Sequence, residues 1–325
     1  MKHSFKKIKR KLWSRIVAYS RSMSFYPYLY QSYWHSLLYR ENTLTITNDF
    51  YFTAQPNPGA GIGHQIANWI AGYWWAKYFE LKFAHSPFSK YEWERFLGFG
   101  KDEVWVEELI RKGYQKVFLP LFDENLTYEV KRIQSIINSY KGKKVIFVCE
   151  LDQYYKDQYG VRLDIQRKFY SAPARKDNKL IFSKEYYNIA IHVRRGDIVV
   201  GQVNKNPNLN MRWQDNDYFI NVLNNVLRKI VTEYPIAIYL FSQGIEKQFE
   251  DFKKFPNIHF CLGMNVQDTF LHMVYADLLI TSKSSFSYKP ALLNQNIKVS
   301  PKDFWHSYPS EESWVLADEE GNIEL

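Results

Sequence analysis

The chain has 325 residues, of which 46% are hydrophobic and 18% aromatic, so it can bury a full core and is not expected to be disordered; this length favours about two domains. It contains no stretch of about 18 uncharged apolar residues and no secretory signal pattern, which argues against a bilayer-crossing helix. Its two cysteines, Cys149 and Cys261, lie far apart and indicate neither a disulfide framework nor a zinc site. We therefore expect a cytoplasmic protein, soluble or peripheral on the cytoplasmic membrane face.

The formal net charge of +9 is concentrated at the N-terminus. Residues 1–40 contain nine Lys or Arg and no Asp or Glu, which leaves 34 basic and 34 acidic residues in the rest of the chain. In residues 1–21 apolar side chains recur among these cations at helical spacing, which predicts an amphipathic helix suited to an anionic membrane surface. A solvated basic helix and a disordered tail are the alternatives. No nucleic-acid partner is expected, because no nucleic-acid module is present.

In chain order, the apolar pattern first predicts a βαβ unit. Its elements are a strand at 51–54, a glycine- and proline-containing loop at 56–63, a helix at 65–79 and a strand at 81–84. Residues 85–140 have a weaker pattern, with helices expected near 103–112 and 126–140. A short buried strand is expected at 144–149.

A second alternating series predicts a parallel-sheet domain. Strands are expected at 189–194, 236–242, 258–262, 278–282 and 298–300, and helices at 216–233, 245–255, 269–276 and 286–294. The polar segment 172–178 is the expected linker. We therefore predict an N-terminal basic segment (1–48), an acceptor-side α/β domain (49–175) and a donor-binding α/β domain (176–325), the two α/β domains facing each other across a cleft.

A glycine-rich loop joins the first predicted strand to its helix. It contains Gly61, Gly63, His64 and Gln65, and glycines at a helix start let backbone amides approach a phosphate. A dinucleotide fingerprint would need glycine where His64 stands and an acidic residue after the next strand, where His85 stands instead. A plain strand-to-helix turn is the other alternative.

A cationic motif closes the predicted strand at 189–194. It places His192 and Arg194 on one face of the strand and continues with Arg195 and Asp197. Such charges are costly to bury unless an anion satisfies them, and a diphosphate would do so through bidentate hydrogen bonds from Arg194. The alternative is a turn held by an ion pair between Arg195 and Asp197.

A serine-rich motif follows the predicted strand at 278–282. Ser284, Ser285 and the amide of Phe286 would lie at a helix start, where hydroxyls cap free amides and the same geometry holds phosphate oxygens. Asp215 and Asp217 resemble a metal-binding pair, but they precede a predicted helix and are better interpreted as its start.

Together these motifs resemble those of GDP-fucose-dependent fucosyltransferases. Residues 192–197 are similar to the His-x-Arg-Arg-Gly-Asp motif of α1,2-, α1,6- and protein O-fucosyltransferases, and the glycine loop, residues 241–243 and residues 284–287 are similar to segments of the bacterial α1,2 enzymes. The resemblance spans about residues 50–305. It implies a GT-B fold, a GDP-sugar donor, inversion at the anomeric carbon, and no metal or other cofactor.

The resemblance also implies residue roles. Arg194, Asp197 and His192 would be catalytic, Arg194 on the β-phosphate and Asp197 as a candidate general base, with Asp215 or Asp217 as alternatives. The implied donor-binding residues are Gly61, Gly63, His64, Gln65, Arg195, Asp268 (on the guanine), Ser284, Ser285 and Phe286.

Several positions depart from the family pattern. His64 replaces an asparagine, Gln243 an aspartate, Tyr288 a tryptophan, and Gln202 stands where α1,6 enzymes have a carboxylate. The acceptor expected from the resemblance is a glycan or a lipid-linked oligosaccharide, as in bacterial surface polysaccharide synthesis. A transferase with a different nucleotide sugar and a non-catalytic anion- or glycan-binding protein are the alternative functions.

Overall fold

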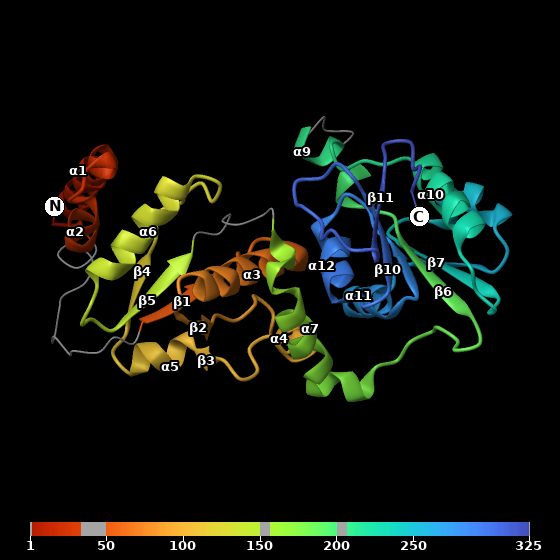
Figure 1. The fold of residues 1–325 in the computed structure, drawn as a ribbon, viewed down its shortest axis with the longest axis horizontal. Helices are drawn as coiled ribbons and strands as arrows, with labels where there is room; N and C mark the ends of the chain where they lie inside the picture. Colours follow the sequence, from red (N-terminus) through yellow and green to blue (C-terminus); the bar gives the residue numbers. More distant parts are fainter. Residues whose placement is uncertain (1, 34–49, 150–156, 200–206, 325) are drawn as a thin grey trace. The chain divides into compact units, whose positions relative to one another are not determined.

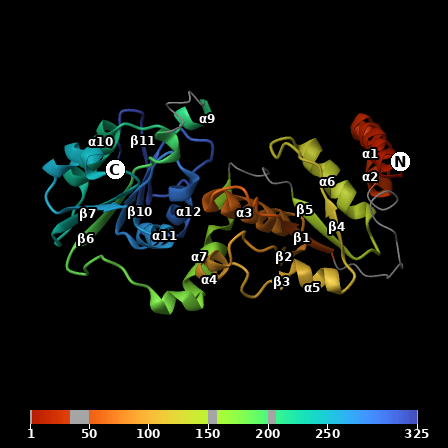
Figure 2. The same cartoon turned by 180° about the vertical axis from the view of Figure 1, so that it is seen from behind.

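The computed structural model describes residues 2–33, 50–149, 157–199 and 207–324 (Figures 1 and 2). They form two compact units. The first contains residues 1–57, 68–89 and 102–154, and the second contains residues 58–67, 90–101 and 155–325. The Gln202 position lies outside the described residues.

The first unit is built on a five-stranded parallel sheet with the order β3-β2-β1-β5-β4. Its strands are β1 (Phe50–Ala54), β2 (Lys82–His85), β3 (Val104–Trp105), β4 (Gln115–Phe118) and β5 (Val145–Cys149). Helices α5 (Val106–Arg111) and α6 (Thr127–Ser139) also belong to it. Strands β1, β2 and β5 and both helices were predicted, whereas β3 and β4 were not.

The N-terminal segment is helical and packs within the first unit. It comprises α1 (Lys2–Tyr19), the 3-10 turn η1 (Ser20–Ser22) and α2 (Tyr26–Ser32). Helix α2 packs against α6, and Gln31 Nε2 donates to the carbonyl of Ser139 at 2.5 Å. Over the described part of the chain, no helix combines the length and apolar character needed to cross a membrane.

The second unit is built on a six-stranded parallel sheet with the order β11-β10-β9-β6-β7-β8. Its strands are β6 (Tyr187–His192), β7 (Ile236–Ser242), β8 (Ile258–Leu262), β9 (Leu278–Ile280), β10 (Ile297–Pro301) and β11 (Trp314–Ala317). The five predicted strands are confirmed, and β11 is additional. A mixed α/β chain with two parallel sheets is thus confirmed, while the GT-B arrangement across a cleft stays a prediction.

Helices cover both faces of this second sheet. Figures 1 and 2 show α10 (Asn216–Lys229) on one face and α11 (Val266–Tyr275) and α12 (Ser285–Leu293) on the other. The 3-10 segment η5 (Glu246–Lys254) replaces the predicted helix at 245–255. The remaining helical segments are α3 (Ile62–Tyr78), α4 (Tyr91–Leu97), η3 (Gln158–Val161), α7 (Arg162–Ser171), η4 (Pro173–Asp177) and α9 (Pro207–Asn210).

The predicted linker at 172–178 forms η4, which packs within the second unit. The Arg175 guanidinium lies 4.0 Å from the ring centroid of Phe169 and 4.6 Å from that of Phe96, and it donates to the Phe96 carbonyl at 2.8 Å. A cation over aromatic faces is stabilised by the ring quadrupoles. The domain boundary after residue 175 stays a prediction, and the boundary after residue 48 lies outside the described residues.

Candidate functional site

The second sheet reverses its strand order between β6 and β9. These strands are neighbours, yet the chain continues from β6 toward β7 and β8 on one side and from β9 toward β10 and β11 on the other. In open α/β sheets, ligands bind in the crevice beyond the carboxyl ends of the strands at such a reversal. The cationic motif follows β6 and the serine motif follows β9, so both lie at this crevice.

His192 links the two strands at the reversal. Its side chain is buried, and Nδ1 lies 2.8 Å from Oγ of Ser282, a hydrogen-bond distance. Burial, together with the nearby charges of Arg194 and Arg195, lowers the pKa of His192 to about 3. The imidazole is therefore neutral at pH 7, which suits a positioning role more than proton transfer.

Arg194 spans from its own turn to the serine motif. One Nη atom donates to Oδ2 of Asp197 at 2.8 Å, and the other donates to Oγ of Ser284 at 3.3 Å. The Arg194 side chain is 17% exposed. A guanidinium with this exposure can still donate a hydrogen bond to an incoming phosphate oxygen. The ion pair in this turn is therefore between Arg194 and Asp197, which corrects the alternative pairing of Arg195 with Asp197.

Arg195 is buried and points toward the segment before α10. It donates to the carbonyl of Gln214 at 3.1 Å and to Oδ1 of Asn216 at 2.7 Å, and it lies 4.2 Å from the ring centroid of Trp213. Burial lowers its pKa to about 10, with Asp215 acting in the opposite direction, so the guanidinium is charged at neutral pH. These contacts make Arg195 an anchor of the turn, and its donor-binding role stays a prediction.

Gly196 has a conformation that the turn requires. Its φ is +68°, in the left-handed region that favours glycine, and the Oε1 atom of Gln243 occupies the space that a Cβ would need. Gln243, which replaces an aspartate of the family pattern, therefore lies beside the turn that contains Arg194 and Arg195.

The serine motif forms the N-terminus of α12. Ser284 is the N-cap, and its Oγ accepts the backbone N–H of Phe286 at 3.2 Å. Within the described part of the chain, neither the N–H nor the hydroxyl of Ser285 has a hydrogen-bond partner. The predicted Phe286 amide is thus engaged by the cap, and the two donors of Ser285 remain for a ligand.

The glycine loop packs directly on this helix start, within the second unit. A Cβ at Gly63 would lie 2.6 Å from the carbonyl carbon of Ser285 and 2.8 Å from the nitrogen of Phe286. Gln65 is buried and donates to the carbonyl of Ala60 at 2.8 Å, which holds the loop. Gly63 therefore permits the N-termini of α3 and α12 to meet.

The remaining loop residues lie beside this contact. His64 is half-buried in the first turn of α3, and its N–H donates to the carbonyl of Gly61 at 3.0 Å. A Cβ at Gly61 would meet no atom within 4 Å. The positive N-termini of α3 and α12 and the Arg194 side chain thus come from the glycine-rich, serine-rich and cationic motifs, all within the second unit.

Asp268, the predicted guanine-binding residue, lies on α11. It is exposed on the first turn of α11, and no hydrogen bond or ion pair joins its carboxylate to another described residue. Helix α11 follows β8 and packs against α12 and β6. The guanine-reading role of Asp268 stays a prediction.

Sequence reasoning assigned no role to two polar residues that support the crevice. Oε1 of Gln214 accepts the N–H of Lys283 at 2.7 Å, and the hydroxyl of Ser242 donates to the carbonyl of Val193 at 2.6 Å. Gln214 gave no sequence signal beyond its position just before a helix, whereas Ser242 lies at the end of a strand and within the motif-like segment 241–243. Tyr288, which replaces a tryptophan of the family pattern, is buried, and its hydroxyl donates to the carbonyl of Ser307 at 2.8 Å. This replacement therefore lies in the core.

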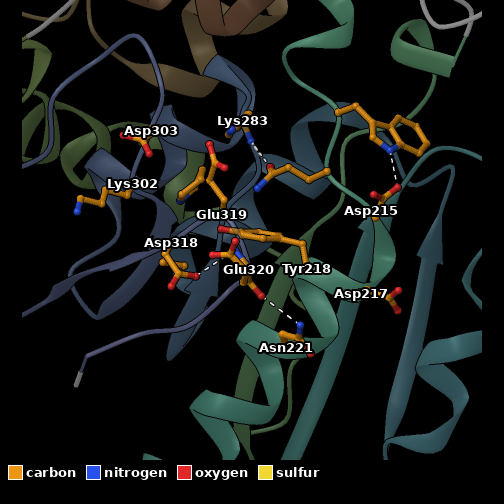
Figure 3. Close-up of a pocket in the computed structure, with 14 residues that line it drawn as sticks. Asp215, Asp217, Tyr218, Asn221, Lys283, Lys302, Asp303, Asp318, Glu319 and Glu320 are labelled. Atoms are coloured by element: carbon orange, nitrogen blue, oxygen red, sulfur yellow. Dashed lines mark hydrogen bonds between the residues drawn. The ribbon is translucent and has the colours of Figure 1, made fainter.

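A cavity of about 350 Å³ adjoins the crevice beside Lys283 (Figure 3). Carboxylates predominate among its charged lining residues, which are Asp215, Asp217, Asp303, Asp318, Glu319 and Glu320 with Lys283 and Lys302. Asp215 accepts from Nε1 of Trp213 at 2.6 Å. No group of three or more His, Cys, Asp or Glu residues in the described ranges is arranged to hold a metal ion. The absence of a metal cofactor stays a prediction.

No family model matches the sequence, and no curated protein matches it. Solved structures similar to this chain include POFUT1 in complex with GDP-fucose, with a TM-score of 0.46 and 12% identity, covering 79% of this chain and 98% of that chain. NodZ alpha-1,6-fucosyltransferase co-crystallized with GDP has a TM-score of 0.42 and 11% identity, covering 86% and 98%. Fucosyltransferase NodZ from Bradyrhizobium has a TM-score of 0.42 and 11% identity, covering 76% and 92%. With TM-scores below 0.5, no conclusion about the function of this chain follows from these likenesses.

Proposed function

We propose that this protein is a glycosyltransferase that moves fucose, or a related sugar, from a GDP-sugar to a hydroxyl group of a glycan. One observation carries the proposal. Arg194, the open donors of Ser285 and the Gly63 contact between two helix N-termini converge where the second sheet reverses its strand order. This arrangement supports the binding of a diphosphate, because a guanidinium and backbone N–H donors lie together at one crevice.

The proposed reaction is a single displacement with inversion. The bond between the anomeric carbon and the β-phosphate oxygen breaks, a bond to the acceptor oxygen forms, and the acceptor proton passes to a base. Negative charge grows on the departing GDP, so Arg194 and the α12 N-terminus stabilise the transition state more than the ground state. We expect no metal requirement, because these groups supply the positive charge.

Asp197 is the proposed general base. Its side chain is 58% exposed and lies beside Arg194, so an acceptor hydroxyl can approach both the base and the diphosphate. Asp215 is engaged by Trp213, and Asp217 is exposed at the start of α10. We propose a glycan or lipid-linked oligosaccharide of a bacterial surface polysaccharide as the acceptor, and a cytoplasmic location.

Calorimetric titration of GDP, UDP, CMP and ADP in the presence of a metal chelator tests the donor site. We expect GDP to bind selectively and Arg194→Ala to weaken it about 10- to 100-fold, the loss of a charged hydrogen bond of about 1.5–3 kcal/mol. Arg167→Ala is the matched control, because Arg167 forms another Arg–Asp pair at this spacing, with Asp164 at 3.3 Å in α7.

The alternatives give different outcomes. Preferred binding of UDP would indicate a transferase with another nucleotide sugar. GDP-sugar binding without release of GDP in the presence of any glycan would favour a non-catalytic binding protein. Equal affinity of wild type and Arg194→Ala would contradict the proposed diphosphate site.

A further inference from the structure

Helix α1 has an exposed apolar stripe opposite a packed face. Ile8, Leu12, Ile16 and Tyr19 are 63%, 60%, 43% and 84% exposed, whereas Val17 on the packed face is 5% exposed. Their spacing of four, four and three residues confines the four exposed side chains to an arc of about 80°. A continuous apolar stripe in water is unfavourable, which indicates that something covers it.

The turn after α1 and helix α2 also carry exposed apolar side chains. Met23, Phe25 and Tyr28 are 41%, 52% and 67% exposed. We call this set of seven side chains, from Ile8 to Tyr28, the N-terminal apolar patch. The patch has a fixed place in the first unit, because Arg21 donates to the carbonyl of Leu121 at 2.7 Å and α2 packs against α6.

Cations flank the N-terminal apolar patch. Lys11 and Arg15 are exposed beside the stripe, and the first 40 residues contain nine basic and no acidic side chains. The remaining chain is balanced in charge, so the positive potential is local to this segment. An occupant must therefore present negative charge and an apolar layer together.

This combination distinguishes between possible occupants. A second copy would bring a second set of cations against the first, which costs Coulomb energy. A nucleic acid would pair with the cations but leave the apolar stripe in water. A bilayer with anionic headgroups satisfies both, since each cation near its surface contributes about 1 kcal/mol and apolar side chains enter the acyl boundary.

We infer that the N-terminal apolar patch docks on a bilayer that contains anionic phospholipid, with α1 lying in the plane of the membrane. Tyr19 and Tyr28 then lie at headgroup level, where aromatic side chains with a polar tip are favoured. This inference stands on the patch alone. If the proposed transferase function also holds, the docking would bring the enzyme to an acceptor carried by a lipid.

Co-sedimentation of the full chain with vesicles tests the docking. One set of vesicles contains phosphatidylcholine with phosphatidylglycerol, and the other contains phosphatidylcholine alone. We expect binding to the anionic vesicles only. Leu12→Gln with Ile16→Gln removes apolar area without changing charge, and Lys11→Gln with Arg15→Gln removes charge without changing the stripe. Each pair should weaken binding by about tenfold or more.

Leu163→Gln with Val231→Gln is the matched control. These side chains are 71% and 98% exposed in the second unit, so their loss removes similar apolar area away from the patch and should leave vesicle binding unchanged. Circular dichroism verifies that each variant is folded, and GDP titration of the same variants keeps a failure here separate from a failure of the donor site.

Three outcomes would overturn the inference. Equal binding to neutral and anionic vesicles would contradict the role of charge. Wild-type binding by the Leu12→Gln, Ile16→Gln variant would contradict insertion of the stripe. Self-association in analytical ultracentrifugation that this variant abolishes would show that a second copy covers the patch.

Discussion

Lys289 on α12 is a buried amine without a counter-ion. It is 1% exposed, and its Nζ has no hydrogen-bond partner among the residues that the structure describes. Nζ lies 4.8 Å from the ring centroid of Tyr288, which in turn stacks on His306. Burial holds the pKa of Lys289 well below its ordinary value. The folded chain therefore disfavours the protonated amine.

We predict that Lys289→Met increases the free energy of unfolding at pH 7 by about 1–3 kcal/mol. The unfolded chain binds a proton at Lys289 below the ordinary pKa of about 10.4, whereas the folded chain resists it. The free energy of unfolding of the wild type therefore decreases as the pH falls below that value. The gain from the variant should thus shrink between pH 7 and pH 9. Urea unfolding at both pH values measures it, with exposed Lys247→Met as the control. A less stable Lys289→Met at both values would contradict the prediction.

The contact of Gly63 with α12 predicts a matched pair of glycine variants. Gly63→Ala should destabilise the chain by about 1–3 kcal/mol through overpacking and weaken GDP binding, because the helix start with Ser285 must shift. Gly61→Ala should be tolerated, because its Cβ meets nothing within 4 Å. Thermal unfolding and GDP titration compare the two. Equal effects would show that flexibility of the loop matters more than the close approach.

At the scale of elements, His272 fastens the segment before β6 to α11. Its Nε2 accepts the N–H of Ile181 at 2.9 Å, and its Nδ1 lies 2.6 Å from the carbonyl of Asp268. This arrangement needs a neutral imidazole that donates from Nδ1, since a protonated Nε2 could not accept. Burial lowers the pKa of His272, while the bond to Asp268 acts in the opposite direction.

We predict that acid weakens this junction. The unfolded chain binds a proton at His272 below about pH 6.5, whereas the folded chain resists it, so the free energy of unfolding falls as the pH drops below that value. His272→Gln should lose stability at pH 7 and show a smaller decrease between pH 7 and pH 5. Urea unfolding at the two pH values tests this, with exposed His259→Gln as the control. An unchanged acid dependence in His272→Gln would contradict the assignment.

The elements that the sequence pattern missed share a position in the fold. Strands β3, β4 and β11 are all edge strands of their sheets. Central parallel strands are buried on both faces and appear as continuous apolar runs, as in β6 and β7, whereas edge strands are partly covered and carry a weaker signal. The predicted central strands therefore place Arg194 and Ser284 at one edge from sequence alone.

The contacts that complete the site could not be predicted in this way. Arg195 turns toward Gln214 and Asn216, about twenty residues later in the chain, and alternation along a strand cannot specify such a partner. The packing of Gly63 on Ser285 joins segments that are more than two hundred residues apart. The sequence showed that these residues are unusual, but their contacts depend on tertiary packing.

At the scale of the whole molecule, the second unit recruits distant segments. Residues 58–67, 90–101 and 157–175 belong to the second unit, although each segment precedes the predicted donor domain. Helix α7 is held to α12 by two side-chain bonds, from Gln166 Nε2 to the Leu292 carbonyl at 2.9 Å and from the Tyr170 hydroxyl to the Leu293 carbonyl at 3.0 Å. These contacts favour a stable fragment that begins before α7.

We predict that a fragment of residues 157–325 is more stable than a fragment of residues 176–325. The shorter fragment loses α7 and exposes apolar surface on α11 and α12, including Phe270, whose ring lies 6.4 Å from that of Phe169. It should therefore aggregate or unfold at lower urea concentration, while the longer fragment keeps a cooperative transition. Urea unfolding and size-exclusion chromatography of both fragments provide the test. If the two fragments unfold at the same midpoint, α7 contributes nothing to the stability of the second sheet, and the boundary after residue 175 is the better division of the chain.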